Sequence, residues 1–387
     1  MSLETQRAVL PLALGCLAVS GRLPCAQAAE WSAAPILSWT MDHASNRSLT
    51  AQAVPGEGAF LNLDAFLKRS TPTLELNMQP SVSLQRFTDA SGSDTVNRSL
   101  NLSGAWAHER SAFNLSASYS DLSTLLTELT TTGIIQGNTR QRFASATASW
   151  QLQQSESRQL AVTLSDSDAR YVGQQANLLP GYQYPSASLA ERFKLSDRTS
   201  FTVSGSVGEL KSRVGGNVRD EELSVTLEHS FSERFSGLAA FGRNDRSAAG
   251  RNHGYVGQFL LRRTDERNQW RLSYQRSVSP TGLGVLVQRD DASFSVSRQL
   301  AEKLNGDLSI GTARDNESLS ASLLNQARRF ESAQTGLNWT SGEASTVGIH
   351  AGYTRAIANS QALVPAAHGW QAGVTYTWKP LSRSISR

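Results

Sequence analysis

The stretch with the most catalytic appearance is Asp-His-Ala-Ser-Asn at residues 42–46. Aspartate, histidine and serine can form a hydrolytic triad, in which histidine takes the serine proton and aspartate orients the histidine. Triad members normally converge from distant segments, however, and loops are rich in these residue types anyway. No Gly-x-Ser-x-Gly motif occurs, and no two of the six histidines have metal-ligand spacing. The sequence therefore predicts a protein that is not an enzyme and needs no cofactor or metal.

Charged side chains on extended segments are the second group that could carry chemistry. Charges that line a pore tune its selectivity, and arginine binds acidic groups through two parallel hydrogen bonds. The alternative is internal ion pairing that only stiffens the protein, and the sequence leaves both interpretations open. The candidates for pore-lining charges are Arg86, Arg98, Arg140, Arg142, Arg192, Arg271, Glu75, Glu191 and Glu228.

The elements that carry these charges are extended. In residues 73–85, Leu74 and Leu76 point to one side of an extended chain, while Glu75 and Asn77 point to the other. Such alternation with a period of two is typical of β-strands with one apolar face. The same pattern recurs at 99–107, 112–120, 159–165, 200–207, 222–231, 270–274, 293–297, 307–311, 335–339 and 346–353. No segment has a long stripe with the 3.6-residue period of a helix, so the chain is predicted to be all-β.

The N-terminus has the features of a secretory signal peptide. Arg7 precedes an apolar stretch at 8–21, and Ala-Gln-Ala at 26–28 is a suitable cleavage site. We therefore expect three parts: a signal peptide at 1–28, one β domain at 29–380, and a short basic tail at 381–387. Both cysteines, Cys16 and Cys25, lie in the signal peptide, so the mature chain can form no disulfide. The formal net charge of +4 is too near neutral to predict nucleic acid binding.

Short and long connections alternate between the expected strands. Eight short turns and nine long connections imply eighteen strands, with both chain ends on the short-turn side; without the first hairpin (about 33–41 and 58–67) the count is sixteen. This asymmetry is typical of outer-membrane barrels, whose periplasmic turns are short and extracellular loops long. The short turns are expected at 68–71, 108–111, 154–157, 196–199, 232–235, 264–268, 301–305 and 341–345. The long connections are expected at 42–57, 87–95, 121–139, 166–187, 211–220, 244–253, 277–291, 314–328 and 354–367.

A closed transmembrane barrel explains the pattern better than a soluble β-sandwich. The less apolar strand faces carry mostly Ser, Thr, Asn, Gln and Gly, and aromatic residues gather near strand ends, as the girdles of membrane barrels do. In the last strand, Trp370 and Trp378 bound one apolar face. Their eight-residue separation, at roughly 3.3 Å per residue and a 45° tilt, spans about 19 Å of membrane. We therefore expect a closed antiparallel barrel in the outer membrane, in contact with lipid and lipopolysaccharide.

The C-terminal strand also resembles the β-signal by which outer-membrane barrels are recognised for assembly. That pattern is matched here by Gln371, Gly373, Tyr376 and Trp378. The resemblance implies that the barrel-assembly machinery is a partner. One departure is the basic tail that follows, because most such proteins end at the terminal aromatic residue.

Four stretches resemble a family of bacterial outer-membrane barrels: residues 80–94, residues 126–133, residues 140–150 and residues 274–290, where Tyr-x-Arg precedes Ser-Pro-x-Gly-x-Gly. They are similar to the β-barrel porin 2 group, which is associated with exopolysaccharide export. The resemblance implies a passage for an exported polysaccharide, with periplasmic export proteins and the polysaccharide chain as partners, and it supplies no catalytic residues. Two alternatives remain: a diffusion porin for small solutes, and a non-conducting docking barrel with surface loops.

Overall fold

The computed structural model describes residues 30–50, 52–88, 94–129, 131, 139–173, 176–213, 216–247, 251–315, 328–358, 366–380 and 383–386. Nearly all of them lie in strands. The predicted signal peptide at 1–28 lies outside the described residues. The elements are β1 (Glu30–Ala44), β2 (Gly56–Ser70), β3 (Leu74–Phe87), β4 (Thr95–His108), β5 (Ser111–Ser123), α2 (Thr124–Thr127), β6 (Arg140–Ser155), β7 (Arg158–Val172), η2 (Ala176–Leu178), β8 (Tyr182–Gln183), β9 (Ser186–Ser196), β10 (Thr199–Ser212), β11 (Gly216–Ser232), β12 (Phe235–Ser247), β13 (Arg251–Thr264), β14 (Asn268–Pro280), β15 (Leu286–Ala301), β16 (Leu304–Asp315), β17 (Arg328–Thr340), β18 (Ser345–Ala358), β19 (Ala367–Trp378) and β20 (Arg383–Ser386).

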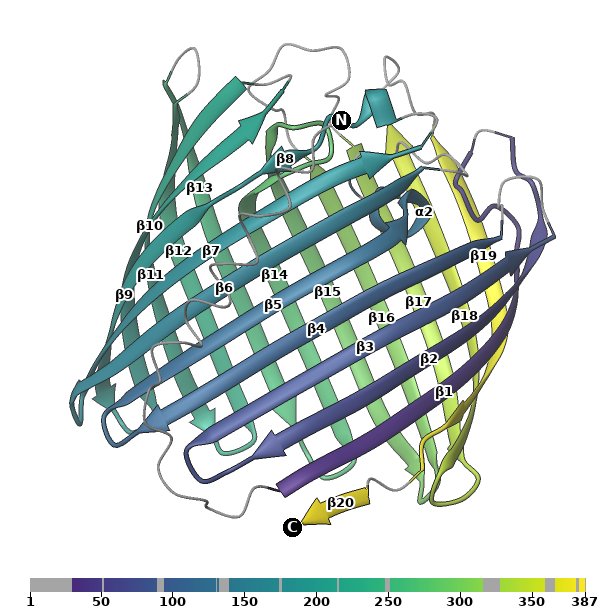
Figure 1. Ribbon diagram of the computed structural model, residues 1–387, viewed down its shortest axis with the longest axis horizontal. Coiled ribbons are helices and arrows are strands. Elements are labelled where there is room, and N and C mark those ends of the chain that lie inside the picture. The colour runs from purple at the N-terminus through teal and green to yellow at the C-terminus, as the bar shows by residue number, and fades with distance from the viewer. Residues whose placement is uncertain are drawn as a thin grey trace.

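The strands form a closed antiparallel barrel (Figure 1). Each strand from β1 to β7 pairs with the next, β7 pairs with β9, and the series continues from β9 to β19. Pairing of β19 with β1 closes the ring, so eighteen of the described strands make up the wall. The predicted all-β class and strand count of eighteen are confirmed. The early hairpin, on which the choice between eighteen and sixteen strands depended, is formed by β1 and β2 over their full lengths.

The two faces of the wall differ as the alternation predicts. On the outer face, Trp106, Phe113 and Trp150 lie in register on β4, β5 and β6, and form a row of aromatic rings. On the inner face, hydroxyl groups of neighbouring strands bond to each other, as Ser118 Oγ and Ser145 Oγ do at 2.7 Å. Burial of apolar groups against lipid and hydration of polar groups in the interior both favour this arrangement.

The connections alternate in length between the two ends of the barrel (Figure 1). At one end the turns are short, as at 109–110 and 156–157. At the other end several strands run further than the sequence predicted. The expected long connections at 211–220 and 244–253 are mostly strand, because β10 ends at Ser212, β11 begins at Gly216 and β12 ends at Ser247. The polar composition of these segments hid the strand extensions, because the part of the barrel wall that extends beyond the membrane can be polar on both faces.

The C-terminal segment also pairs with the barrel. After the break that follows Trp378, residues Arg383–Ser386 form β20, which pairs with residues Glu30–Ala33 at the start of β1. The β19 ladder covers the rest of β1, from Leu37 to Ala44. β19 and β20 therefore extend the seam toward the short-turn end. Among the described residues, no helix is long and apolar enough to cross a bilayer.

Candidate functional site: a constriction built from inward-folded connections

The β14–β15 hairpin leaves the wall near the long-loop end. Its ladder with β13 ends at Gly257 and Arg276, whereas β14 and β15 remain paired up to Pro280 and Leu286. β13 continues alongside β12 as far as Arg251. The hairpin thus separates from β13 while its own two strands remain paired, so its tip can enter the interior.

The tip of the hairpin contacts segments on another part of the wall. Gly181 N, in the β7–β9 connection, donates to Gly282 O at 3.3 Å. Gly284 has φ +71° and lies so close to Ser212 at the end of β10 that a Cβ would overlap its hydroxyl. Glycine is required there both for its left-handed backbone and for this close approach. Between β10 and β14 the wall holds three further strands, so the tip crosses about 19 Å at roughly 4.8 Å per strand.

Glu128 is the centre of the polar contacts around the tip. It follows α2 in the β5–β6 connection and is only 2% exposed. Its carboxylate accepts hydrogen bonds from the Tyr171 hydroxyl, from Gln141 Nε2 at 3.1 Å and from Thr131 Oγ1 at 2.7 Å. Gly282 lies against the same group, since an added Cβ would overlap the Tyr171 hydroxyl and lie 3.1 Å from Glu128 Oε1. We call Glu128, Gln141, Tyr171, Gly181 and Gly282 the constriction.

An apolar cluster holds the hairpin against the inside of β10 and β11. Leu286 at the start of β15 packs with Leu210 and Val218, and all three are buried. Val278 and Tyr182 pack around them. The hydrophobic effect favours this contact, because in a polar, water-filled interior the leucines would otherwise be hydrated. The hairpin is therefore fixed to the wall and is not a loosely attached loop.

A second polar network lies beside this cluster. Asp220 on β11 accepts hydrogen bonds from Asn244 Nδ2 at 2.6 Å and from the Tyr184 hydroxyl at 3.1 Å. Burial raises the pKa of the Tyr184 hydroxyl, and the charge of Asp220 adds to the rise. Burial also raises the pKa of Tyr182 to about 12, with a further contribution from the charge of Glu128. Both hydroxyls therefore stay protonated over the physiological pH range, and the Tyr184 hydroxyl donates to Asp220.

The β1–β2 connection folds inward on the other side of the barrel mouth. Leu49 is buried there with Phe330 on β17, and Leu129, which follows Glu128, packs against the same cluster. The β5–β6 connection therefore contacts the β14–β15 hairpin through Glu128 and the β17 wall through Leu129. Leu49 has φ +48°, a conformation that costs a leucine roughly 1–2 kcal/mol, so its burial must offset this strain.

The residues of the apparent triad have other partners. Asp42 forms a two-fold ion pair with Arg47, at 2.6 and 3.0 Å, and both side chains are almost fully buried. The Arg47 guanidinium also lies over the ring of Phe87, 5.0 Å from its centroid. His43, on the opposite face of β1, contacts the Trp370 ring. Asp42 and His43 thus point to different sides of the wall. Among the described residues, no group of three His, Cys, Asp or Glu side chains is arranged to hold a metal ion.

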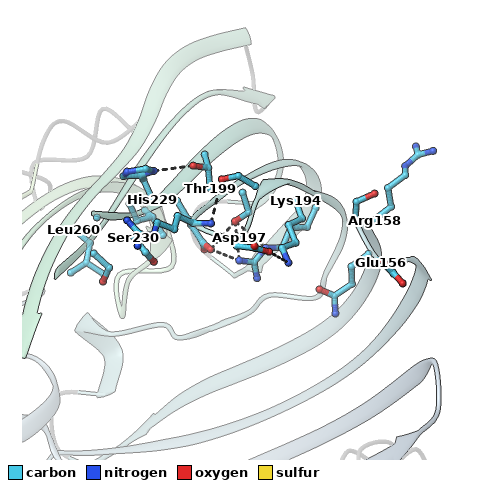
Figure 2. Close-up of a pocket in the computed structure, with 18 of the residues that line it drawn as sticks. Glu156, Arg158, Lys194, Asp197, Thr199, His229, Ser230 and Leu260 are labelled. Atoms are coloured by element: carbon cyan, nitrogen blue, oxygen red, sulfur yellow. Dashed lines mark hydrogen bonds and ion pairs between the residues drawn. The ribbon is translucent and has the colours of Figure 1, made fainter. Parts of the chain in front are cut away.

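The interior at the short-turn end contains a polar groove of about 520 Å³ (Figure 2). It extends over β7 and β9 to β13. Arg192 Nη2 donates there to Glu228 Oε2 at 2.6 Å and to Ser200 Oγ at 2.8 Å. Figure 2 also shows Thr199 beside His229, joined by a 2.9 Å hydrogen bond. The groove is open on one side, and Leu238 and Leu260 line it beside these polar groups.

Four of the nine candidate pore-lining charges project into the interior. Arg192 and Glu228 form the ion pair of the groove. Arg271 lies in register with Arg262, one of the residues that line the groove. Glu75 accepts a hydrogen bond from Lys68 at 2.8 Å, and Lys68 lines a second interior groove with Asn77. Three of these four charges are therefore paired with a neighbour.

The other five lie on the outer side of the wall, which corrects the expected placement. Residues two apart share a strand face, so Arg98 points the same way as Leu100, and Glu191 the same way as Leu189. Glu191 pairs with Arg158 at 2.7 Å. The remaining three are Arg86, which lies 3.5 Å from Asp94, and Arg140 and Arg142, which both lie beside Asp121.

The residues that resemble the β-signal lie at the seam. Trp378 and Tyr376 are in register with Leu37 and Trp39 of β1, so the last long strand closes the barrel. Gly373, on the inner face, is so close to the backbone of β1 that a Cβ would meet Met41 O at 2.5 Å. Gln371 lies in register with Ala44 at the end of the ladder. Recognition of these residues by an assembly machinery remains a prediction.

The constriction itself was missed at the sequence level. Glu128 and Tyr171 fall in stretches expected to be long loops, with nothing to pair them. Residues 279–284, Ser-Pro-Thr-Gly-Leu-Gly, were a signal: two glycines in one short turn indicate close approach by another segment. Which segment approaches could not be predicted.

Comparison with known proteins gives information about the fold only. No protein-family model matches the sequence, and no curated protein matches it. Among solved structures, OccK2 (OpdF) of Pseudomonas aeruginosa is 9% identical, with a TM-score of 0.50 over 91% of this chain and 98% of its own. OccAB3 of Acinetobacter baumannii is 12% identical, with a TM-score of 0.49 over 90% of this chain and 99% of its own. A second OccK2 structure, in complex with glucuronate, is 9% identical with a TM-score of 0.49, over 91% and 98%.

At these identities the likeness concerns architecture only. The chain has the closed eighteen-stranded fold of the Occ and Opd outer-membrane barrels. Coverage of nearly the whole of both chains means that the match extends around the ring and is not limited to one sheet segment.

Proposed function

We propose that this protein is an outer-membrane porin that lets small hydrophilic solutes cross through a narrowed, polar interior. The observation that carries the proposal is the constriction, in which the β14–β15 hairpin contacts Glu128 and Tyr171 inside a wide barrel. An eighteen-stranded wall alone would enclose a broad aqueous channel. Connections that fold inward and pack against each other narrow that channel, which favours small solutes over a long polymer.

The composition of the inner wall supports passage of hydrated solutes. Serine hydroxyls on neighbouring strands bond to one another, as in Ser204 with Ser224 and Ser273 with Ser293. Such groups exchange hydrogen bonds with water and solutes easily and hold neither strongly. Three of the four candidate charges in the interior, Glu75, Arg192 and Glu228, are paired, so they orient a solute without trapping it.

Polysaccharide export, the expectation from the family resemblance, receives no comparable support. A long sugar chain needs an opening that stays wide along the whole path, whereas here Leu49, Glu128 and Gly282 come from three connections that converge at one mouth. The small-solute porin, the alternative left open by the sequence, suits this geometry better.

Two measurements on the reconstituted barrel test the proposal. Planar-bilayer recordings should show discrete conductance steps, and liposome swelling should occur with small sugars and fall sharply as sugar size increases. Swelling with large oligosaccharides at an undiminished rate would favour an export passage. Absence of both conductance and swelling from correctly folded, heat-modifiable barrel would favour a docking barrel and overturn the porin.

A further inference from the structure

Four charged residues form a row across the outer face of adjacent strands. Arg98 on β4 is in register with Asp121 on β5, Asp121 with Arg142 on β6, and Arg142 with Arg170 on β7. We call these four residues the rim row. They share their strand faces with outward apolar residues, so they point away from the interior. The strands they occupy run into the long connections, which places the row toward that end of the barrel.

The rim row lies just beyond the apolar band. On β4, Arg98 is eight residues from the aromatic Trp106, about 26 Å along the strand at roughly 3.3 Å per residue. With a 45° tilt this is about 19 Å along the membrane normal, close to the height of the hydrocarbon region facing a barrel. On β5, Tyr119 occupies the rung directly below Asp121. The row is therefore at the level of lipid headgroups on the long-loop side.

The carboxylates around the row do not balance its guanidinium groups. Asp121 accepts from Arg140 Nε at 2.6 Å, while Arg142 Nε is 3.6 Å away from the same carboxylate. Arg170 is held by Asp168 through two hydrogen bonds of 2.7 and 2.8 Å. Arg98, which is exposed, forms no ion pair with any carboxylate in the part of the chain that the structure describes. Around Asp121, three positive charges thus face one negative charge.

Two outward arginines elsewhere on the wall each have a carboxylate partner at short distance. Arg276 on β14 bonds to Asp290 through both nitrogens, at 2.6 and 2.9 Å. Arg243 on β12 bonds to Asp245 at 2.8 Å. On the β4–β6 face, by contrast, Arg98 has no carboxylate partner among the described residues, and Arg142 shares Asp121 with Arg140. Glu331 is shared in a similar way on β17 and β18, by Arg329 and Arg355.

We propose that Arg98 and Arg142 bind the phosphate groups of lipopolysaccharide in the outer leaflet. The inference rests on the outer-membrane location of the proposed porin. Guanidinium groups bind phosphate through paired, charge-assisted hydrogen bonds, and arginine is well suited to this because its planar donors match two phosphate oxygens. The exposed Tyr119 ring and Leu100 on the rung below offer apolar surface to the acyl chains beneath such a headgroup.

The test compares lipids that differ only in phosphate. Purified full-length barrel is titrated with diphosphorylated lipid A, dephosphorylated lipid A or phosphatidylglycerol, and bound lipid is counted by native mass spectrometry. The wild type should prefer diphosphorylated lipid A. The double variant Arg98→Gln, Arg142→Gln should lose roughly tenfold in affinity for it, as expected for two exposed charge-assisted contacts. The matched control Arg243→Gln, Arg276→Gln removes two outward charges from another face and should change affinity less than twofold.

Three outcomes would overturn the inference. These are equal loss in the two double variants, equal binding of phosphorylated and dephosphorylated lipid A by the wild type, and equal binding of phosphatidylglycerol, which would indicate a general anionic-lipid surface. Conductance of the same variants separates this inference from the porin proposal. A wild type that conducts normally but shows no preference for diphosphorylated lipid A overturns only the lipid site, and a wild type that binds lipid A without conducting overturns only the porin.

Discussion

Gly282→Ala tests whether the hairpin tip limits passage. A methyl group at this position would overlap the Tyr171 hydroxyl and approach Glu128 Oε1 to 3.1 Å. Tyr171 cannot easily move away, because Gln141 Nε2 donates to its hydroxyl at 2.7 Å and the hydroxyl itself donates to Glu128. Either this network must break or the hairpin must withdraw.

The size of the effect follows from overpacking. Extra methyl groups in well-packed sites cost about 1–3 kcal/mol. Because 1.4 kcal/mol is a factor of ten in an equilibrium, the population of the withdrawn hairpin should rise roughly 5- to 150-fold. The wall is unaffected, since the substituted residue lies beyond the end of the β14–β15 ladder.

Single-channel recording measures this directly. Gly282→Ala should show more frequent or longer openings of high conductance than the wild type. Gly342→Ala is the matched control, because Gly342 lies in the short β17–β18 connection and an added Cβ there has nothing within 4 Å. Identical conductance in wild type, Gly282→Ala and the control, with normal heat-modifiable mobility, would refute the view that the hairpin obstructs the channel.

Three further predictions concern assembly, selectivity and pH. Replacing Tyr376 and Trp378 with Ala should lower the amount of heat-modifiable barrel in the outer membrane several-fold, because it weakens the seam and the resemblance to the β-signal. Unchanged levels of heat-modifiable barrel on gels would count against a role of these residues in assembly. Arg192→Gln leaves the Glu228 carboxylate without its strongest partner, so the reversal potential in a salt gradient should shift toward cation selectivity. The free energy of unfolding should change by less than about 1 kcal/mol, because the ion pair is half exposed. A shift toward anion selectivity would contradict the lumenal placement. The pKa of Tyr182 is raised to about 12 in the folded protein, so its contribution to the packed connection is fully present below pH 10 and is lost as pH rises toward 12. Conductance should therefore increase over this interval. The increase should be smaller in a Tyr182→Phe variant but not absent, because burial also raises the pKa of Tyr171 and Tyr184; an unchanged increase would contradict the role of Tyr182.

Several features of the fold could be predicted because the alternation of apolar and polar residues in each strand depends only on the surroundings of that strand. In residues 73–85 the alternation alone separates Leu74 and Leu76 from Glu75 and Asn77, and the period requires no knowledge of neighbouring strands. The same local rule, followed consistently, places Arg98 on the face of Leu100. For Arg142 the rule was uninformative, because the next residues on its face are alanines, which fit lipid and lumen equally well.

Other features depend on which segments meet. The contact of Gly282 with Tyr171 joins residues more than one hundred positions apart, and the alternation of neither strand refers to the other. Likewise, the pairing of Leu49 with Phe330 requires that one connection turn inward and not outward, a choice that polar loop composition does not decide.

The sequence by itself determined the closed eighteen-stranded wall, its two faces and its two unlike ends, because lipid outside and water inside act on every residue of every strand. Tertiary structure alone decided that three long connections enter the mouth and narrow it. That outcome depends on the simultaneous fit of a glycine tip, a buried carboxylate and a leucine cluster from distant segments, and the fit exists only once the ring has closed.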